Sequence, residues 1–331
     1  MFQQLATAFR QAGLNADEQR LLQLARRIKA DFNQYLIPDE VVSGFGYRHP
    51  DGWVEPIIHP SDTRTGILYR LLPMTRSIIG ELFTPEHVQD HLRLIESHLR
   101  FPDGVRLMNK PISYQGGVRK LFRRAEESAY FGREIGLQYV HAHIRYIEAM
   151  CKIGQAQKAY DAILQIVPIT IQDQVSNAVT RQSNAYFSSS DADVRDRDEA
   201  EQLWDALRAG KVRVKGGWRI YSSGPGILIN QIVSNFLGLR LSFDDVVIDP
   251  VLPKQLDGLQ FTFAIDEKPI TVIYLIAGDA PASVQSVTIN GTETGFKRDQ
   301  NPYRPGGVRI PRNDVHPLLT DDTNHILVSL A

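Results

Sequence analysis

The helices of this chain give way to strands directly after residues 217–239, which read Gly217-Trp218-Arg219-Ile220-Tyr221-Ser222-Ser223-Gly224-Pro225-Gly226 and continue as the apolar run Ile227–Leu239. Small residues and two hydroxyls stand where a helix begins, so its free backbone N–H groups, its dipole, Ser222 and Ser223 can all face one phosphate-sized anion. No Lys-Ser or Lys-Thr pair closes the loop as in a Walker A motif, and Gly224–Gly226 is too short for a dinucleotide fingerprint. The segment therefore predicts an anion site that does not take a nucleotide, with an ordinary Ser-capped helix start as the alternative.

Hydrophobic periodicity differs on the two sides of this segment. Up to Leu239 the pattern is helical, and from Arg240 onward short β-rich runs are separated by Pro, Gly, Asn and Asp. Runs of that kind predict an antiparallel β-sandwich. We therefore expect a mainly α chain, with a helical domain over residues 1–239 and a C-terminal β-sandwich domain over residues 240–331.

Short sequence patterns predict where two helices begin and which two loops between helices carry function. Asn15 followed by Glu18 resembles a capping box and predicts a long helix. Thr84-Pro85-Glu86 predicts the start of another helix. The connections 101–138 and 167–197 are longer than paired helices require, and such loops usually carry function.

Composition excludes several classes of protein. The 331 residues are 43% hydrophobic and carry 37 Lys and Arg against 38 Asp and Glu, so no field of one sign attracts nucleic acid or an anionic membrane. The N-terminal residues are amphipathic where a signal peptide needs an unbroken apolar run, and no run approaches the length of a membrane span, so we expect a cytoplasmic protein. Cys151 lies in a helical pattern and is expected to be a core thiol.

A second segment places a carboxylate, an aromatic ring and two imidazoles near one helix start. It reads Phe131-Gly132-Arg133-Glu134-Ile135-Gly136-Leu137-Gln138-Tyr139-Val140-His141-Ala142-His143. His141 and His143 are two positions apart and face different directions on a helix, so they cannot share a metal, and no metal site is expected. The alternative to a binding site is a helix with solvated polar residues and one hydrogen-bonded core histidine.

A third segment, residues 181–193, has the residue types that bind sugars. Gln182, Asn184 and Asp191 offer hydrogen-bond partners for hydroxyl groups, and Tyr186 offers an aromatic face for the C–H edges of a sugar ring. The alternative is a surface loop in which Asp191 or Asp193 caps a turn.

The order and spacing of these segments resemble glycoside hydrolase family 94. The resemblance is carried by Arg133-Glu134-x-Gly136-x-Gln138-Tyr139-x-His141-Ala142, Gly216-Gly217-Trp218-x-x-Tyr221-Ser222-Ser223-x-x-Gly226, Leu237-Gly238-Leu239 and Ile248-Asp249-Pro250-x-x-Pro253. It implies the second half of an (α/α)6 barrel followed by a C-terminal antiparallel β-sandwich. Within the family, Phe131–Gly136 and Ser188–Asp191 resemble the branch that acts on β-1,2-linked glucans.

The same resemblance implies roles for individual residues. Phosphate would be bound by His141, Ser222 and Ser223. The sugar would be bound by Glu134, with Arg133, Gln138, Tyr186 and Asp191 beside it. Members that act on cellobiose carry Asn-Gly-Gly after the Glu and Thr-Gly-Ser at the phosphate loop, whereas this chain has Ile135-Gly136-Leu137 and Ser222-Ser223-Gly224, which argues against cellobiose as the substrate.

The resemblance also implies an inverting phosphorylase that needs no metal or organic cofactor. Inorganic phosphate is the co-substrate and replaces the second carboxylate that an inverting hydrolase needs to activate water. The family's general acid is an Asp in an Asp-Trp-Asn-Asp motif, which this sequence does not contain. We therefore expect no catalytic residue in this chain, a general acid upstream of it, and possible partnership with the missing N-terminal part of the enzyme.

Two other functions stay open at this point. One is a non-catalytic remnant that binds carbohydrate or a partner, which the missing acid favours for the isolated chain. The weaker alternative is an inverting hydrolase, for which Glu134 is the only good candidate as the carboxylate that activates water.

Overall fold

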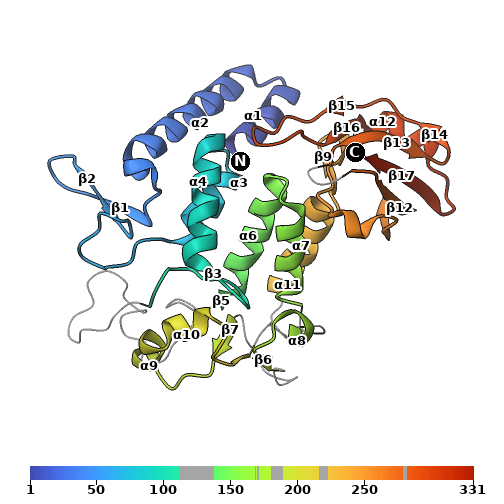
Figure 1. Ribbon diagram of the computed structural model, residues 1–331. Coiled ribbons are helices and arrows are strands. Elements are labelled where there is room, and N and C mark those ends of the chain that lie inside the picture. The colour runs from blue at the N-terminus through green and yellow to red at the C-terminus, as the bar shows by residue number, and fades with distance from the viewer. Residues whose placement is uncertain (112–137, 168, 170, 180–188, 216–222, 279–281) are drawn as a thin grey trace. The chain divides into compact units, whose positions relative to one another are not determined.

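The computed structural model describes the chain apart from residues 112–137, 168, 170, 180–188, 216–222 and 279–281 (Figure 1). Contacts divide the chain into two compact units. The first comprises Met1–Phe101, Val105–Leu137 and Asp193–Val212, and the second comprises Pro102–Gly104, Gln138–Ala192 and Arg213–Ala331. The second unit holds helices from before residue 239 together with the strands that follow it, and the predicted domain boundary between residues 239 and 240 stays a prediction.

The first unit is mainly helical. Its helices are α1 (Phe2–Gln11), α2 (Asn15–Leu36), η1 (Pro38–Glu40), α3 (Leu71–Ile79), α4 (Pro85–Leu94), α9 (Arg197–Gln202) and α10 (Trp204–Arg208). Helix α1 packs against α2, and α4 continues as the π-helical turn η2 (Ile95–Leu99). Strands β1 (Phe45–Arg48) and β2 (Val54–Ile57) form an antiparallel hairpin, and β3 (Arg100–Phe101) and β4 (Gly104–Val105) form another two-stranded sheet.

The two predicted helix starts have different outcomes. Thr84 caps α4 as predicted, because its hydroxyl accepts a hydrogen bond from the His87 backbone N–H at 3.2 Å. The long helix at Asn15 is also confirmed, but its capping box is wrong. Gly13, with a φ of 76°, turns the chain so tightly after α1 that the Leu14 carbonyl already accepts the first helical bond, from the Glu18 N–H at 3.0 Å.

The second unit contains a buried helix with two neighbours. Its helices are α6 (Val140–Lys152), α7 (Ala156–Leu164), α8 (Ile171–Gln174) and α11 (Ser223–Gln231), which continues as the π-helical turn η4 (Ile232–Phe236). Helix α6 packs against both α7 and α11. Apolar residues lie on nearly all of its sides, from Val140 to Met150, which is typical of a helix surrounded by other elements.

Residues after 238 form a β domain of two sheets. The first has the order β15 (Lys297–Arg298), β16 (Val308–Pro311), β10 (Asp245–Ile248) and β9 (Leu239–Ser242). The second has the order β11 (Gln260–Ile265), β12 (Lys268–Ile276), β17 (Asn324–Leu330), β13 (Val284–Ile289) and β14 (Thr292–Glu293). The short helices η5 (Lys254–Leu256), α12 (Arg312–Val315) and η6 (His316–Leu318) lie between strands.

The predicted C-terminal β domain is therefore confirmed, with one pair of strands that departs from antiparallel pairing. Strands β12 and β17 run parallel, from Ile270 opposite Asn324 to Ile276 opposite Leu330. Parallel neighbours need a long connection, and the chain between these two strands includes β13 to β16. The assignment of the helices to half of an (α/α)6 barrel stays a prediction.

A glycine makes the junction between the last helix and the β domain possible. Gly238 has a φ of 73°, and a Cβ atom there would lie 2.2 Å from the Asp249 carbonyl carbon. Its own carbonyl accepts a hydrogen bond from the Asp249 N–H at 2.8 Å. The Leu237-Gly238-Leu239 and Ile248-Asp249-Pro250 motifs thus meet in space, and only glycine fits at their contact.

Candidate functional site

A small four-stranded sheet in the second unit contains strands from two of the segments that the sequence analysis singled out and a strand that shortly precedes the remaining one. Its strands, in spatial order, are β5 (Gln138–Tyr139), β7 (Ser189–Ala192), β8 (Val214–Lys215) and β6 (Ala178–Val179). Gln138 lies opposite Ser190, and Asp191 lies opposite Lys215. Strand β5 lies within the second segment, residues 131–143, and β7 lies in the sugar-type segment (Figure 1). Strand β8 ends at Lys215, shortly before the first segment begins at residue 217. Three stretches that are distant in sequence therefore come together at this sheet.

The predicted site residues are described to different degrees. Gln138 and His141 are described with their side chains, and Asp191 in β7 and Ser223 at the start of α11 are described by their backbone. Arg133, Glu134, Tyr186 and Ser222 lie outside the described residues. The roles predicted for the whole set stay predictions.

His141 is the second residue of α6 and is half-buried. Its Nδ1 atom is hydrogen-bonded to the Tyr139 hydroxyl at 2.9 Å, and the two rings meet edge to face at 5.2 Å. When the phenol donates to Nδ1, the imidazole proton is on Nε2, so Nε2 is a hydrogen-bond donor. The position at a helix N-terminus adds backbone N–H groups and the positive end of the helix dipole, both of which favour an anion.

Gln138 has a buried amide beside His143 and Gly104. The Gln138 side chain is fully buried, and among the described residues neither Oε1 nor Nε2 has a hydrogen-bond partner. A Cβ atom on Gly104, which has a φ of 120°, would lie 2.6 Å from His143 Nδ1 and 2.9 Å from Gln138 Nε2. His143 Nε2 donates to the Ala162 carbonyl at 2.7 Å, so His143 is the hydrogen-bonded core histidine that the sequence left open.

Three other ionisable residues of α6 are either paired with each other or buried. Arg145 forms an ion pair with Glu148 at 2.6 Å. Cys151 is buried as predicted, and burial raises the pKa of its thiol to about 12. A thiol with that pKa stays protonated at neutral pH and is not a nucleophile.

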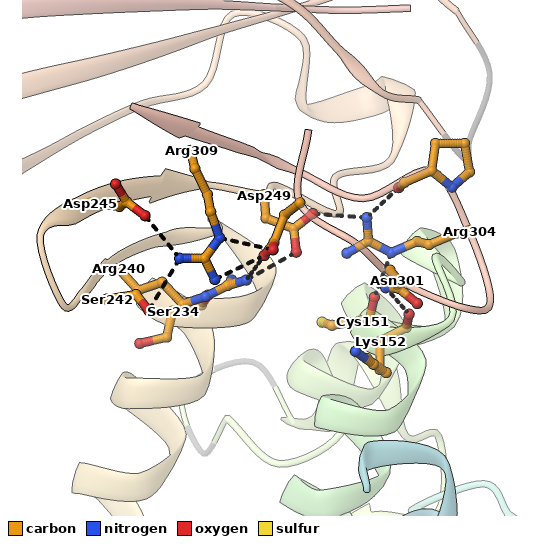
Figure 2. A network of polar contacts seen from close by, with 12 residues as sticks. Cys151, Lys152, Ser234, Arg240, Ser242, Asp245, Asp249, Asn301, Arg304 and Arg309 are labelled. Atoms are coloured by element: carbon orange, nitrogen blue, oxygen red, sulfur yellow. Dashed lines mark hydrogen bonds and ion pairs between the residues drawn. The ribbon is translucent and has the colours of Figure 1, made fainter. Parts of the chain in front are cut away.

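The C-terminal end of α6 is held by the β domain (Figure 2). Asn301 Nδ2 donates to the Lys152 carbonyl at 2.9 Å, and Arg304 Nε donates to the Cys151 carbonyl at 3.2 Å. These are carbonyls that a helix end leaves without an intrahelical partner. The β domain thus supplies the C-terminal cap of the helix whose N-terminal turn carries His141.

Asp249 connects this cap to the rest of the β domain. Its Oδ1 accepts from Arg304 Nη1 at 2.8 Å, and its Oδ2 lies 3.3 Å from Arg240 Nη2. The Arg304 and Asp249 side chains are only 7% and 13% exposed. Arg304 and Asn301 were not predicted from the sequence, and the only signal was the Pro- and Gly-rich run that follows Asp299, which predicts a loop without showing what the loop contacts.

The described residues lack two features that would indicate other classes of protein. Among the described residues, no group of three or more His, Cys, Asp or Glu side chains is placed to hold a metal ion. Within the same residues, no helix combines the length and the apolar character that a membrane span requires.

Comparison with known proteins identifies relatives. Residues 238–328 match the family model of the glycoside phosphorylase C-terminal domain. The chain is 44% identical over 293 residues to a 1,2-beta-oligoglucan phosphorylase of Listeria innocua, and the alignment covers 88% of this chain and 26% of that protein. The chain therefore spans about a quarter of the length of this relative. The predicted resemblance to glycoside phosphorylases of β-1,2-glucans, over a C-terminal portion, is confirmed.

Two of the solved structures that match are distantly similar to this chain. A sialidase has a TM-score of 0.43 and 11% sequence identity, covering 97% of this chain and 25% of its own. A family GH92 α-mannosidase from Bacteroides thetaiotaomicron has a TM-score of 0.38 and 14% identity, covering 98% of this chain and 34% of its own.

Proposed function

We propose that residues 1–331 form the C-terminal part of an inverting glycoside phosphorylase that cleaves β-1,2-linked glucooligosaccharides with phosphate. The 44% identity to a 1,2-beta-oligoglucan phosphorylase over 88% of the chain is the observation that carries this proposal. The products would be α-glucose 1-phosphate and a shortened glucan. Membership of glycoside hydrolase family 94, the half-barrel and a cytoplasmic location belong to the same proposal.

In the proposed reaction, phosphate and the glucan meet at the N-terminal end of α6, where His141 lies. A phosphate oxygen attacks the anomeric carbon, the glycosidic C–O bond breaks on the opposite face, and a general acid gives its proton to the leaving oxygen. Phosphate is already an anionic nucleophile, so it needs positioning more than it needs a base. His141, Ser222, Ser223 and the start of α11 would hold it, and no other co-substrate or cofactor is required.

The small sheet supports this proposal because it fixes the ends of all three loops that would line the site. Arg133 and Glu134 precede β5, Tyr186 precedes β7, and Ser222 follows β8. The buried Gln138 amide adds to this support. An unsatisfied buried polar group costs on the order of 1–3 kcal/mol, and hydroxyl groups of a bound sugar would satisfy it.

A second function is favoured by one observation. The sequence contains no Asp-Trp-Asn-Asp motif. Without a general acid, the chain alone would bind glucan but would not catalyse its phosphorolysis. We therefore propose that the isolated chain is inactive and that the acid is contributed by another segment.

A chimera tests the proposed activity. This chain would replace the matched segment of the Listeria relative, and sophorotriose and cellobiose would be offered with and without phosphate. We expect release of glucose 1-phosphate from sophorotriose, dependent on phosphate, and less from cellobiose. The isolated 331-residue chain should release none. Faster turnover of cellobiose would refute the linkage, sugar release without phosphate would indicate a hydrolase, and turnover by the isolated chain would refute the external acid.

A substitution at His141 tests the phosphate site in the same chimera. Losing one hydrogen bond to a charged group costs on the order of 1.5–3 kcal/mol, or roughly ten- to a hundred-fold in affinity. We expect His141→Ala to raise the KM for phosphate by about that factor while changing the KM for glucan less. His316→Ala, at an exposed histidine of the β domain, is the matched control. An unchanged phosphate KM in His141→Ala would show that the helix start is an ordinary N-terminus.

A further inference from the structure

The hairpin β1–β2 presents three aromatic rings on one face. Tyr47 lies opposite Glu55, and the His49 N–H donates to the Trp53 carbonyl at 2.7 Å. Side chains alternate between the two faces of a strand, so Tyr47, His49, Trp53 and Glu55 all lie on the same face. We call these four residues, with Arg64, the aromatic platform.

The rings are ordered and yet open to solvent. The His49 ring stacks on Trp53 at 4.7 Å between centroids and meets Tyr47 edge to face at 4.8 Å. Trp53 and Tyr47 nevertheless remain 56% and 51% exposed. Tyr and Trp are enriched at interfaces, and exposed apolar side chains that cluster within a polar rim mark sites where a ligand or partner binds.

Polar groups hold the platform and leave hydrogen-bonding capacity at its edge. Glu55 Oε2 is hydrogen-bonded to His49 Nε2 at 2.9 Å, and Glu55 Oε1 lies 2.8 Å from Arg64 Nε. The Arg64 side chain is 46% exposed, and a guanidinium group has five N–H donors in a plane. Because the rotamers are already fixed by these contacts, a ligand would lose little entropy in ordering them.

We propose that the aromatic platform binds a neutral carbohydrate chain. A pyranose ring stacks its C–H face on Trp53, and its hydroxyl groups accept hydrogen bonds from Arg64 and donate to Glu55. The charge of the platform fits a neutral ligand, because the Glu55 carboxylate and the Arg64 guanidinium compensate each other. A purely apolar partner would leave these two groups desolvated and unused, at a cost.

The choice of glucan as the probe rests on the proposed function. Native electrophoresis of the 331-residue chain through gels with and without linear β-1,2-glucan measures retardation directly. We expect retardation of the unmodified chain and about tenfold or greater weakening in Trp53→Ala, since a stacked ring contributes about one order of magnitude in affinity. Tyr47→Ala should weaken binding in the same direction. Phe263→Ala, at a 47% exposed aromatic residue of β11, removes an equivalent ring elsewhere and should bind as the unmodified chain does.

Each outcome separates this proposal from the proposed function. Retardation of Trp53→Ala equal to that of the unmodified chain, or an unmodified chain that is not retarded, would overturn the platform whatever the chimera does. Loss of retardation in Trp53→Ala with an unchanged circular dichroism spectrum would support the platform even if the chimera releases no glucose 1-phosphate. Equal weakening in Phe263→Ala would indicate nonspecific contact of exposed rings with the gel and would also overturn it.

Discussion

Replacing Asp249 with alanine is expected to lower the free energy of unfolding by about 3–5 kcal/mol, the usual cost of removing one partner from a buried ion pair. The substitution leaves the Arg304 guanidinium almost fully buried, since its side chain is only 7% exposed, and removes the carboxylate that lies 2.8 Å from it. Arg240 loses a partner at the same time. Urea denaturation of the 331-residue chain, followed by circular dichroism, measures the change.

Two further variants test whether the buried ion pair causes the loss of stability in Asp249→Ala. Arg27 and Asp31 form an ion pair on α2 with side chains 81% and 53% exposed, so Asp31→Ala should change stability by less than about 1 kcal/mol. Adding Arg304→Met to Asp249→Ala should recover part of the loss, because the unpaired charge is then gone. If Asp249→Ala costs no more than Asp31→Ala, the pair is not buried in solution and the β domain does not hold α6 by charge.

This ion pair also bears on the proposed phosphate site. The β domain caps the end of α6 through Asn301 and Arg304, and the opposite end of α6 carries His141. Helix α6 is one continuous helix between these ends. The β domain therefore contributes to the position of His141 without containing a residue predicted to touch the substrate.

Sequence patterns predicted which helices and strands form. They did not predict the contacts that hold these elements in place. The Asn15 and Glu18 pattern correctly indicated a long helix, but the cap depended on how tightly Gly13 turns the chain, which residue types alone do not show. The change of periodicity after Leu239 correctly indicated strands. The parallel pairing of β12 with β17 could not be predicted, because strand order is set by packing between distant segments.

The candidate site likewise contains features that the sequence predicted and contacts that it did not. Residue types marked the segments around His141, Asp191 and Ser223 as chemically unusual, and the structure pairs strands that lie within or shortly before these segments in one sheet. Asp249 was noticed only as part of a motif, and its role requires Arg304, fifty-five positions away along the chain. The aromatic platform was missed because the pattern around Trp53 indicates a hairpin equally well whether its rings are buried or exposed.

Acid is expected to destabilise the first unit through His91. This side chain is fully buried and stacks on Phe83 at 4.2 Å between ring centroids. Its Nε2 accepts a hydrogen bond from the Val42 N–H at 3.0 Å, and its Nδ1 donates to the His87 carbonyl at 2.7 Å. These two bonds fix the neutral tautomer, since a proton on Nε2 would face the Val42 N–H.

The sign of the pH dependence follows from the pKa. Burial lowers the pKa of His91 from its ordinary value of 6.5 to about 4, and the neighbouring His87 imidazole adds to the lowering. The hydrogen bond to the His87 carbonyl and the carboxylates of Asp90 and Glu40 oppose this shift with smaller effects. A folded-state pKa below the unfolded one means that the stabilising contribution is complete above pH 6.5 and is lost as the pH falls toward 4. This difference between the folded and unfolded pKa of His91 corresponds to about 3 kcal/mol in the free energy of unfolding.

The measurement compares unfolding free energies of the unmodified chain and His91→Gln between pH 7 and pH 4. Glutamine can accept from the Val42 N–H through its amide oxygen and donate to the His87 carbonyl through its amide nitrogen, but it does not titrate. We expect the unmodified chain to lose about 3 kcal/mol more than His91→Gln over this range. His325→Gln, at an exposed histidine of β17, should keep the pH dependence of the unmodified chain. Parallel pH profiles for the unmodified chain and His91→Gln would show that the pKa of His91 is the same in the folded and unfolded chain, and that other groups cause any acid unfolding.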